Sequence, residues 1–103
     1  MSRVKITVLK RLDPHEIFGE NLPATPVQQP FGPCEAFKDG QEFIVDSPRV
    51  PQDFPCSSAW QTIYYYVREL LWGANIPWYK EGKVVVPSCI DGLRPVIFKL
   101  ERI

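Results

Sequence analysis

The sequence has no net charge and no long apolar run, and these two absences remove two classes of partner. Its 12 lysines and arginines are balanced by 12 aspartates and glutamates, without a basic stripe. A nucleic-acid-binding surface would need such a stripe to neutralise phosphates. The longest apolar runs fall far short of the roughly 20 residues that a membrane-spanning helix needs. We therefore expect neither a nucleic acid nor a membrane as a partner.

The first residues of the sequence do not have the pattern of a signal peptide. The first residues, MSRVKITVLKR, alternate between apolar and polar side chains and contain no continuous apolar core. The alternation over residues 3–9 instead predicts a half-buried strand. We expect the protein to be cytoplasmic.

The motifs of the common enzyme classes are absent. The sequence has no nucleophile-elbow serine, no phosphate-binding loop, no dinucleotide-binding glycine motif and no zinc-protease motif. The single histidine, His15, could complete a zinc site with cysteines, but it lies in a proline-containing segment where solvent exposure is expected. The sequence therefore leaves open whether the protein is an enzyme.

The length and the 45% hydrophobic composition fit one small domain over residues 1–103. We predict an α+β fold in which one main helix packs on a mainly antiparallel sheet, with the terminal strands paired or adjacent. The expected parts are a proline-rich loop over 13–33, a short strand over 42–45, a main helix over 57–73 and a C-terminal β-hairpin over 83–101.

The main helix has recognisable ends. Ser58 and Gln61 have the spacing of a capping box, and Gly73 stands where a helix C-terminal glycine belongs. Cys56 lies just before the first turn, where unpaired amide groups and the helix dipole favour a negative charge. We expect Cys56 to be the most thiolate-like cysteine.

The hairpin brings a second cysteine close to an arginine. A two-residue Asp91-Gly92 turn would place Cys89 opposite Arg94 on the neighbouring strand. The guanidinium of Arg94 could then stabilise a thiolate or hold an anionic ligand. Alternatively, Arg94 caps the end of the sheet or forms an ion pair with Asp91.

The three cysteines, Cys34, Cys56 and Cys89, are an odd number, which argues against a disulfide framework. Each lies at the predicted end of an element, where functional sites are often built. Together they could hold a zinc ion with a fourth ligand, or an iron–sulfur cluster. No CxxC pair supports a metal site, and the alternative is that all three are small buried hydrophobic residues.

Three segments of the sequence, GPCEAFKDGQEFIV, PCSSAW and SCIDGLRPVIFKLERI, resemble a family of small uncharacterised prokaryotic proteins. The C-terminal segment carries the most specific part of the resemblance, and the proline-rich loop departs from the family pattern. The resemblance implies a three-cysteine site with an arginine near it, but no activity. The matching positions are Cys34, Cys56 and Cys89, the glycines Gly40, Gly73 and Gly92, and Arg94.

Three hypotheses about the function follow from these residues. The leading hypothesis is a cysteine-lined site for metal or cluster binding or for thiol redox chemistry, in which Cys56 and Cys89 react and Arg94 stabilises a charge. The alternative is a non-catalytic interaction module, a homo-oligomer or a subunit of a larger enzyme, anchored by exposed aromatics. The candidate anchors of this interaction module are Tyr65, Trp72, Trp78 and Tyr79. A third hypothesis is a small-molecule binder beneath the proline-rich loop.

Overall fold

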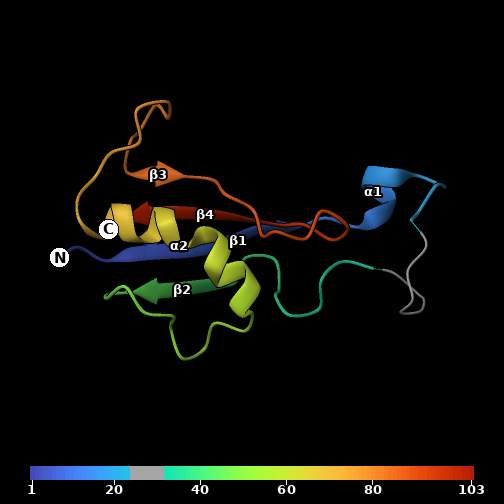
Figure 1. The fold of residues 1–103 in the computed structure, drawn as a ribbon, viewed down its shortest axis with the longest axis horizontal. Coiled ribbons are helices and arrows are strands. Elements are labelled where there is room, and N and C mark those ends of the chain that lie inside the picture. Colours follow the sequence, from blue (N-terminus) through green and yellow to red (C-terminus); the bar gives the residue numbers. More distant parts are fainter. Residues whose placement is uncertain (24–31) are drawn as a thin grey trace.

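The computed structural model of the protein describes residues 1–23 and 32–103. This part of the chain forms a four-stranded sheet in the order β2-β1-β4-β3, and each pair of neighbouring strands is antiparallel. Helix α2 lies across one face of the sheet (Figure 1), which confirms the predicted α+β fold. The elements are β1 Val4–Arg11, α1 Pro14–Phe18, β2 Glu42–Val45, α2 Ser57–Leu71, β3 Val84–Val85 and β4 Val96–Arg102.

Strand β1 lies at the centre of the sheet, between β2 and β4. Its alternating sequence buries Val4, Ile6 and Val8 completely on the side that carries α2, as a period of two predicts. The opposite face is partly exposed and carries charged residues beside apolar ones such as Ile44. There the Lys5 ammonium lies 3.7 Å from the Glu42 carboxylate and 3.8 Å from that of Glu101. Such exposed ion pairs add little stability, so burial against α2 accounts for most of the contribution of β1.

A β-bulge interrupts β1 between Val8 and Lys10. Before the bulge Val8 pairs with Phe98, and after it Arg11 pairs with Val96. Both Phe98 and Val96 are buried beneath α2. Because Leu9 is the extra residue, the bulge brings Arg11 into register with a position on the helix side of the sheet.

Helix α2 contacts β1 and β4 through one apolar stripe. The stripe repeats at intervals of three and four residues, which is the period of an amphipathic helix. Full burial of each Val, Leu or Ile side chain contributes about 1.5–3 kcal/mol relative to exposure, so the stripe anchors the helix. Its buried residues are Ala59, Ile63, Val67, Leu70 and Leu71.

The ends of α2 differ in how well the sequence predicts them. The helix ends at Leu71, Trp72 is the C-cap, and Gly73 follows with φ +88°, the left-handed conformation expected of a terminal glycine. At the other end the predicted capping box does not form, because Cys56 is the N-cap and its sulfur accepts the backbone N–H of Ala59 at 3.4 Å. The helix therefore begins earlier than a cap at Ser58 would require.

An aromatic cluster closes the core next to the start of α2. The ring of Phe37 meets those of Phe43, Phe54 and Phe98 in edge-to-face contacts, with centroids 5.2–6.2 Å apart. Phe54 also contacts Trp60 of α2 at 5.7 Å. These contacts fix the segment after Cys34 against the sheet, since such pairs add to the burial of large apolar rings.

The predicted proline-rich loop over 13–33 contains a short helix. Pro14–Phe18 forms α1, capped by Asp13, where the sequence allows one helical turn over 16–21. The remainder of the predicted proline-rich loop includes residues 24–31, which lie outside the described residues. In the described part of the chain, no helix is both long and apolar enough to cross a membrane.

The C-terminal hairpin is present, but its register is not the predicted one. The backbone N–H of Cys89 donates to the carbonyl oxygen of Val96 at 2.9 Å, and Ser88 bridges Ile97. Cys89 is therefore opposite Val96 rather than Arg94, and residues 90–95 form the loop. Pro95 has no N–H for a ladder hydrogen bond, so the two-residue turn cannot extend into a regular ladder at this position.

Candidate functional site

One cavity of about 370 Å³ is lined by all three cysteines of the protein. Cys34 comes from the segment before β2, Cys56 from the start of α2 and Cys89 from the hairpin. These three segments lie at the same end of α2 in Figure 1. Phe37, Ala59 and Val96 contribute an apolar wall, and we call the space the three-cysteine cavity. Side chains that are far apart in the sequence thus reach one space through the folding of the sheet and helix.

Cys56 lies at the positive end of the α2 dipole. Its backbone is extended, with φ −138° and ψ +114°, and its sulfur accepts the Ala59 N–H as described above. Ser58 and Ala59 of the first helical turn border the same cavity. The sulfur of Cys56 is therefore both a structural cap and a partly buried group on the wall of the cavity.

Cys89 is held in place by the hairpin. Its sulfur accepts the backbone N–H of Val96 at 3.3 Å, and its thiol lies 3.9 Å from the carbonyl oxygen of Asp91. Both contacts form because Cys89 is opposite Val96 and residues 90–95 make up the hairpin loop. Although Cys89 is not paired with Arg94, the two side chains still share the cavity, because residues 90–95 curve back along its edge.

Cys34 is held through its backbone by an arginine of β1. The Nη1 group of Arg11 donates to the carbonyl oxygen of Cys34 at 3.0 Å. Arg11 is held in turn by Asp39, whose Oδ1 accepts the Arg11 backbone N–H at 2.9 Å and its Nε–H at 3.1 Å. These hydrogen bonds, the backbone one first, hold the pKa of Asp39 below its ordinary value. The loop that carries Cys34 is therefore tied to the central strand.

The Arg94 guanidinium supplies the cationic group of the cavity. Its Nε lies 4.0 Å from Oδ2 of Asp91, which is an ion pair but too long for a hydrogen bond. Within residues 1–23 and 32–103, Nε of Arg94 is the one buried side-chain nitrogen or oxygen without a hydrogen-bond partner. The ion pair anticipated as an alternative for Arg94 is thus present, and it leaves one N–H of the guanidinium unused.

The proposed metal ligands do not form a preformed metal centre. Across the described ranges, no group of three or more His, Cys, Asp or Glu side chains is arranged to hold a metal ion. All three cysteines are free and partly buried. His15 is exposed and its Nδ1 lies 2.7 Å from Oδ1 of Asp13, so it serves the cap of α1. The metal-ligand set Cys34, Cys56 and Cys89 stays a prediction.

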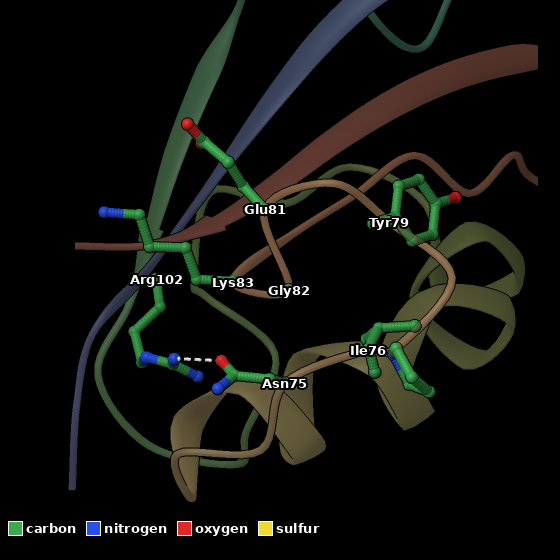
Figure 2. Close-up of a pocket in the computed structure, with 8 residues that line it drawn as sticks. Asn75, Ile76, Tyr79, Glu81, Gly82, Lys83 and Arg102 are labelled. Atoms are coloured by element: carbon green, nitrogen blue, oxygen red, sulfur yellow. Dashed lines mark hydrogen bonds between the residues drawn. The ribbon is translucent and has the colours of Figure 1, made fainter.

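A second hollow, of about 500 Å³, lies at the opposite end of α2. Arg102 crosses it to donate to Oδ1 of Asn75 at 2.7 Å, and its other donors reach the carbonyl oxygens of Leu70 and Ala74. In Figure 2 the side chains of Glu81 and Lys83 point away from Asn75. The guanidinium of Arg102 is thus already used to cap the end of α2, which favours a structural junction over a ligand site.

Three aromatic side chains of the predicted interaction surface are exposed within the described chain. Tyr65 and Trp72 on α2 are each 64% exposed, and Trp78 in the following loop is 70% exposed. Tyr79 differs, because its hydroxyl accepts the backbone N–H of Val86 at 3.1 Å and it packs against the core. No described part of the proline-rich loop covers Tyr65 or Trp72.

Arg11, Asp39 and Phe37 are site-forming residues that the sequence did not reveal. The signals are weak: Asp39-Gly40 is a dipeptide typical of turns, but nothing in the sequence shows that the Asp39 carboxylate meets β1. The bulge at Leu9, which sets the position of Arg11, has no clear mark in the alternating segment.

No protein-family model, curated protein or solved structure matches the chain. This result is consistent with the resemblance to a family of unassigned function. The function must therefore be argued from the three-cysteine cavity itself.

Proposed function

We propose that the protein binds a small thiol-reactive molecule in the three-cysteine cavity, with Cys56 as the reacting thiol. One observation carries the proposal: Cys34, Cys56 and Cys89 come from three separate segments and line the same space. The volume of about 370 Å³ falls within the range of small-molecule sites. An apolar wall with a few polar groups at its edge is also typical of such sites.

The three thiols have different roles in this proposal. Cys56 is the nucleophile in this proposal, because its sulfur lies at the N-terminus of α2 and on the wall of the cavity. Cys89 contributes to the wall from the hairpin, where its sulfur accepts the Val96 N–H. Cys34 completes the site from a loop held by Arg11. The same thiols form the candidate ligand set for zinc, which would require them to converge to bonds of about 2.3 Å.

Alkylation of the folded protein tests the proposal. The reduced protein is treated with iodoacetamide under anaerobic conditions, and the modification of each cysteine is followed by peptide mass spectrometry. We expect Cys56 to react first, with the reaction slowed by a ligand that fills the cavity. Cys56→Ser should remove the fast phase, and Cys89→Ser and Cys34→Ser should retain it.

Two results would contradict this proposal. All three thiols could resist alkylation until the protein unfolds, which would make them inert core residues. Alternatively, elemental analysis of the same anaerobic preparation could find a stoichiometric metal lost in the cysteine variants. That second result would replace the nucleophilic role of Cys56 with a ligand role.

The exposure of Tyr65, Trp72 and Trp78 favours a second candidate function, an interaction module that acts through these rings. Aromatic residues are enriched at protein interfaces and at their energetic centres. Light scattering over a range of protein concentrations would report self-association, and Trp72→Ser should weaken it. A monomer at all concentrations would contradict self-association through this surface.

A further inference from the structure

A third hollow, of about 320 Å³, adjoins the three-cysteine cavity along the start of α2. Ser58 and Ile90 line both spaces. The other lining residues are Gln61 and Thr62, and we call this space the α2 hollow. Because the two spaces share part of their walls, a molecule seated in the cavity can extend into the α2 hollow.

Ile90 marks the boundary between the two spaces. It lies in the loop of the C-terminal hairpin and is 75% exposed, although its side chain is large and apolar. The preceding residue, Cys89, is held to Val96 by the backbone hydrogen bond described above. A ligand that spans both spaces covers Ile90, and the burial of its apolar surface favours such a ligand over one confined to the cavity.

The helical wall of the α2 hollow offers neutral hydrogen-bonding groups. Residues 58, 61 and 62 have the i, i+3, i+4 spacing of one helix face. The Thr62 hydroxyl already donates to the carbonyl oxygen of Ser58 at 2.9 Å, so towards a ligand it acts as an acceptor. The side-chain amide of Gln61 can both donate and accept. These groups match the N–H and C=O of an amide.

The charges on the walls favour an uncharged ligand. Among the described residues, no lysine, arginine, aspartate or glutamate lines the α2 hollow. In the cavity the charged lining residues are Asp91 and Arg94, which have opposite signs and form an ion pair. A charged tail in the α2 hollow would lose hydration without gaining a counter-charge, which is unfavourable.

The length of the combined site limits the size of the ligand. At about 1.5 Å per residue, Thr62 is about 9 Å along the helix axis from Cys56. An extended chain covers about 3.3 Å per residue. A dipeptide with an acyl group at its reactive end therefore spans the distance.

We propose that the ligand of the three-cysteine cavity is an uncharged, peptide-like amide of about two residues, whose thiol-reactive end lies at Cys56 and whose tail crosses Ile90 to reach Gln61. This inference rests on the proposed function and names the class of molecule that the site takes. Ile90 and Gln61 act as specificity residues, because they contact the tail and not the reacting atoms.

Two reagents with the same reactive group provide the test. Iodoacetamide has no tail, and N-iodoacetyl-alanyl-alaninamide carries an uncharged dipeptide tail. In both reactions the thiol proton first passes to water. The thiolate sulfur then attacks the CH₂ carbon, the S–C bond forms, the C–I bond breaks and iodide leaves. The ratio of the dipeptide rate to the iodoacetamide rate at Cys56 therefore measures recognition of the tail, and changes in thiol reactivity cancel.

We expect this ratio to be about tenfold higher in the folded protein than in the unfolded protein, as burial of Ile90 against the tail predicts. Ile90→Ala should lower the ratio several-fold, and Ile44→Ala, at a partly exposed position on β2, is the matched control that should retain it. Gln61→Ala should also lower the ratio, whereas Arg68→Ala, at an exposed position of α2 outside both spaces, should not. Circular dichroism checks that each variant is folded.

Two further reagents test the class of tail. N-hexyl iodoacetamide has an apolar tail of similar length, and N-iodoacetyl-alanyl-alanine ends in a charged carboxylate. We expect both to react more slowly with Cys56 than the dipeptide amide does, relative to their rates with the unfolded protein. A faster relative rate for either reagent would overturn the assignment of an uncharged amide.

The outcomes separate the two proposals. A reactive Cys56 with a dipeptide ratio equal to the unfolded value, unchanged in Ile90→Ala and Gln61→Ala, would overturn the extended ligand and leave the thiol site standing. Complete resistance of Cys56 to all four reagents in the folded protein would overturn both proposals.

Discussion

The Nη1 group of Arg11 hydrogen-bonds to the carbonyl oxygen of Cys34 at 3.0 Å, across 23 residues of sequence. This contact joins the central strand to a loop that borders the three-cysteine cavity. It makes the position of one thiol depend on a side chain that does not itself line the cavity.

Replacing Arg11 should therefore release Cys34 more than Cys56. In Arg11→Met we expect the alkylation rate of Cys34 to rise several-fold relative to that of Cys56, because the loop loses its hydrogen bond to β1. Lys10→Met, a neighbouring exposed position, provides the control and should leave the relative rates unchanged. If the ratio of the Cys34 rate to the Cys56 rate were the same in the wild type, Arg11→Met and Lys10→Met, Arg11 would not position Cys34.

Acid should loosen the same contact through Asp39. Its pKa is held below the ordinary value of 3.8 by the backbone N–H of Arg11 and then by the Arg11 side chain. A depressed folded-state pKa stabilises the protein above the unfolded value, and this contribution is lost as the pH falls through the folded-state pKa. Asp39→Asn should thus flatten the decline of melting temperature between roughly pH 5 and pH 2. An unchanged acid profile in Asp39→Asn would contradict the linkage.

The cap at Cys56 can be tested separately from its chemistry. Cys56→Ala removes the acceptor for the Ala59 N–H and should lower the free energy of unfolding by about 1 kcal/mol. Cys56→Ser supplies a better cap and should be as stable as the wild type or more so. Denaturant unfolding of the two variants measures the difference, and equal stability of both would mean that the sulfur does not cap α2.

The junction shown in Figure 2 depends on the absence of a side chain at Gly82. A Cβ there would lie 2.6 Å from Cβ of Asn75 and 3.2 Å from its Cα. Gly82→Ala should therefore destabilise the protein by about 1–3 kcal/mol, since the backbone of Asn75 must move. Gly92→Ala meets nothing within 4 Å and is the matched control. Thermal unfolding would contradict the prediction if both variants melted together.

The sequence predicts a helix or strand best where a regular repeat of apolar side chains determines it. The alternation after Arg3 predicts β1, and the apolar stripe ending before Gly73 predicts α2, because each burial pattern is local. Strand β2 at Glu42–Val45 is also predicted with its observed bounds. These elements can be predicted without knowing which distant segments pack against them.

The site is less predictable because it depends on register. The Asp91-Gly92 pair suggests a two-residue turn, whereas Pro95 and the Cys89–Val96 hydrogen bonds produce a wider loop. Ser58 fits a capping box, but the sulfur of Cys56, ordinarily a weak acceptor, takes the cap position. The sequence nevertheless identifies Cys34, Cys56, Cys89 and Arg94 as one candidate set, and these residues do line one cavity.

The bulge at Leu9 changes which side of the sheet is reached by odd- and even-numbered residues of β1. Up to Val8 the even positions are buried beneath α2, but Arg11, an odd position, is opposite the buried Val96. If Leu9 were paired regularly with Ile97 instead of being unpaired, Lys10 would lie opposite Val96 in the place of Arg11. The geometry around Cys34 thus depends on one unpaired residue in a strand as much as on the identity of its neighbours.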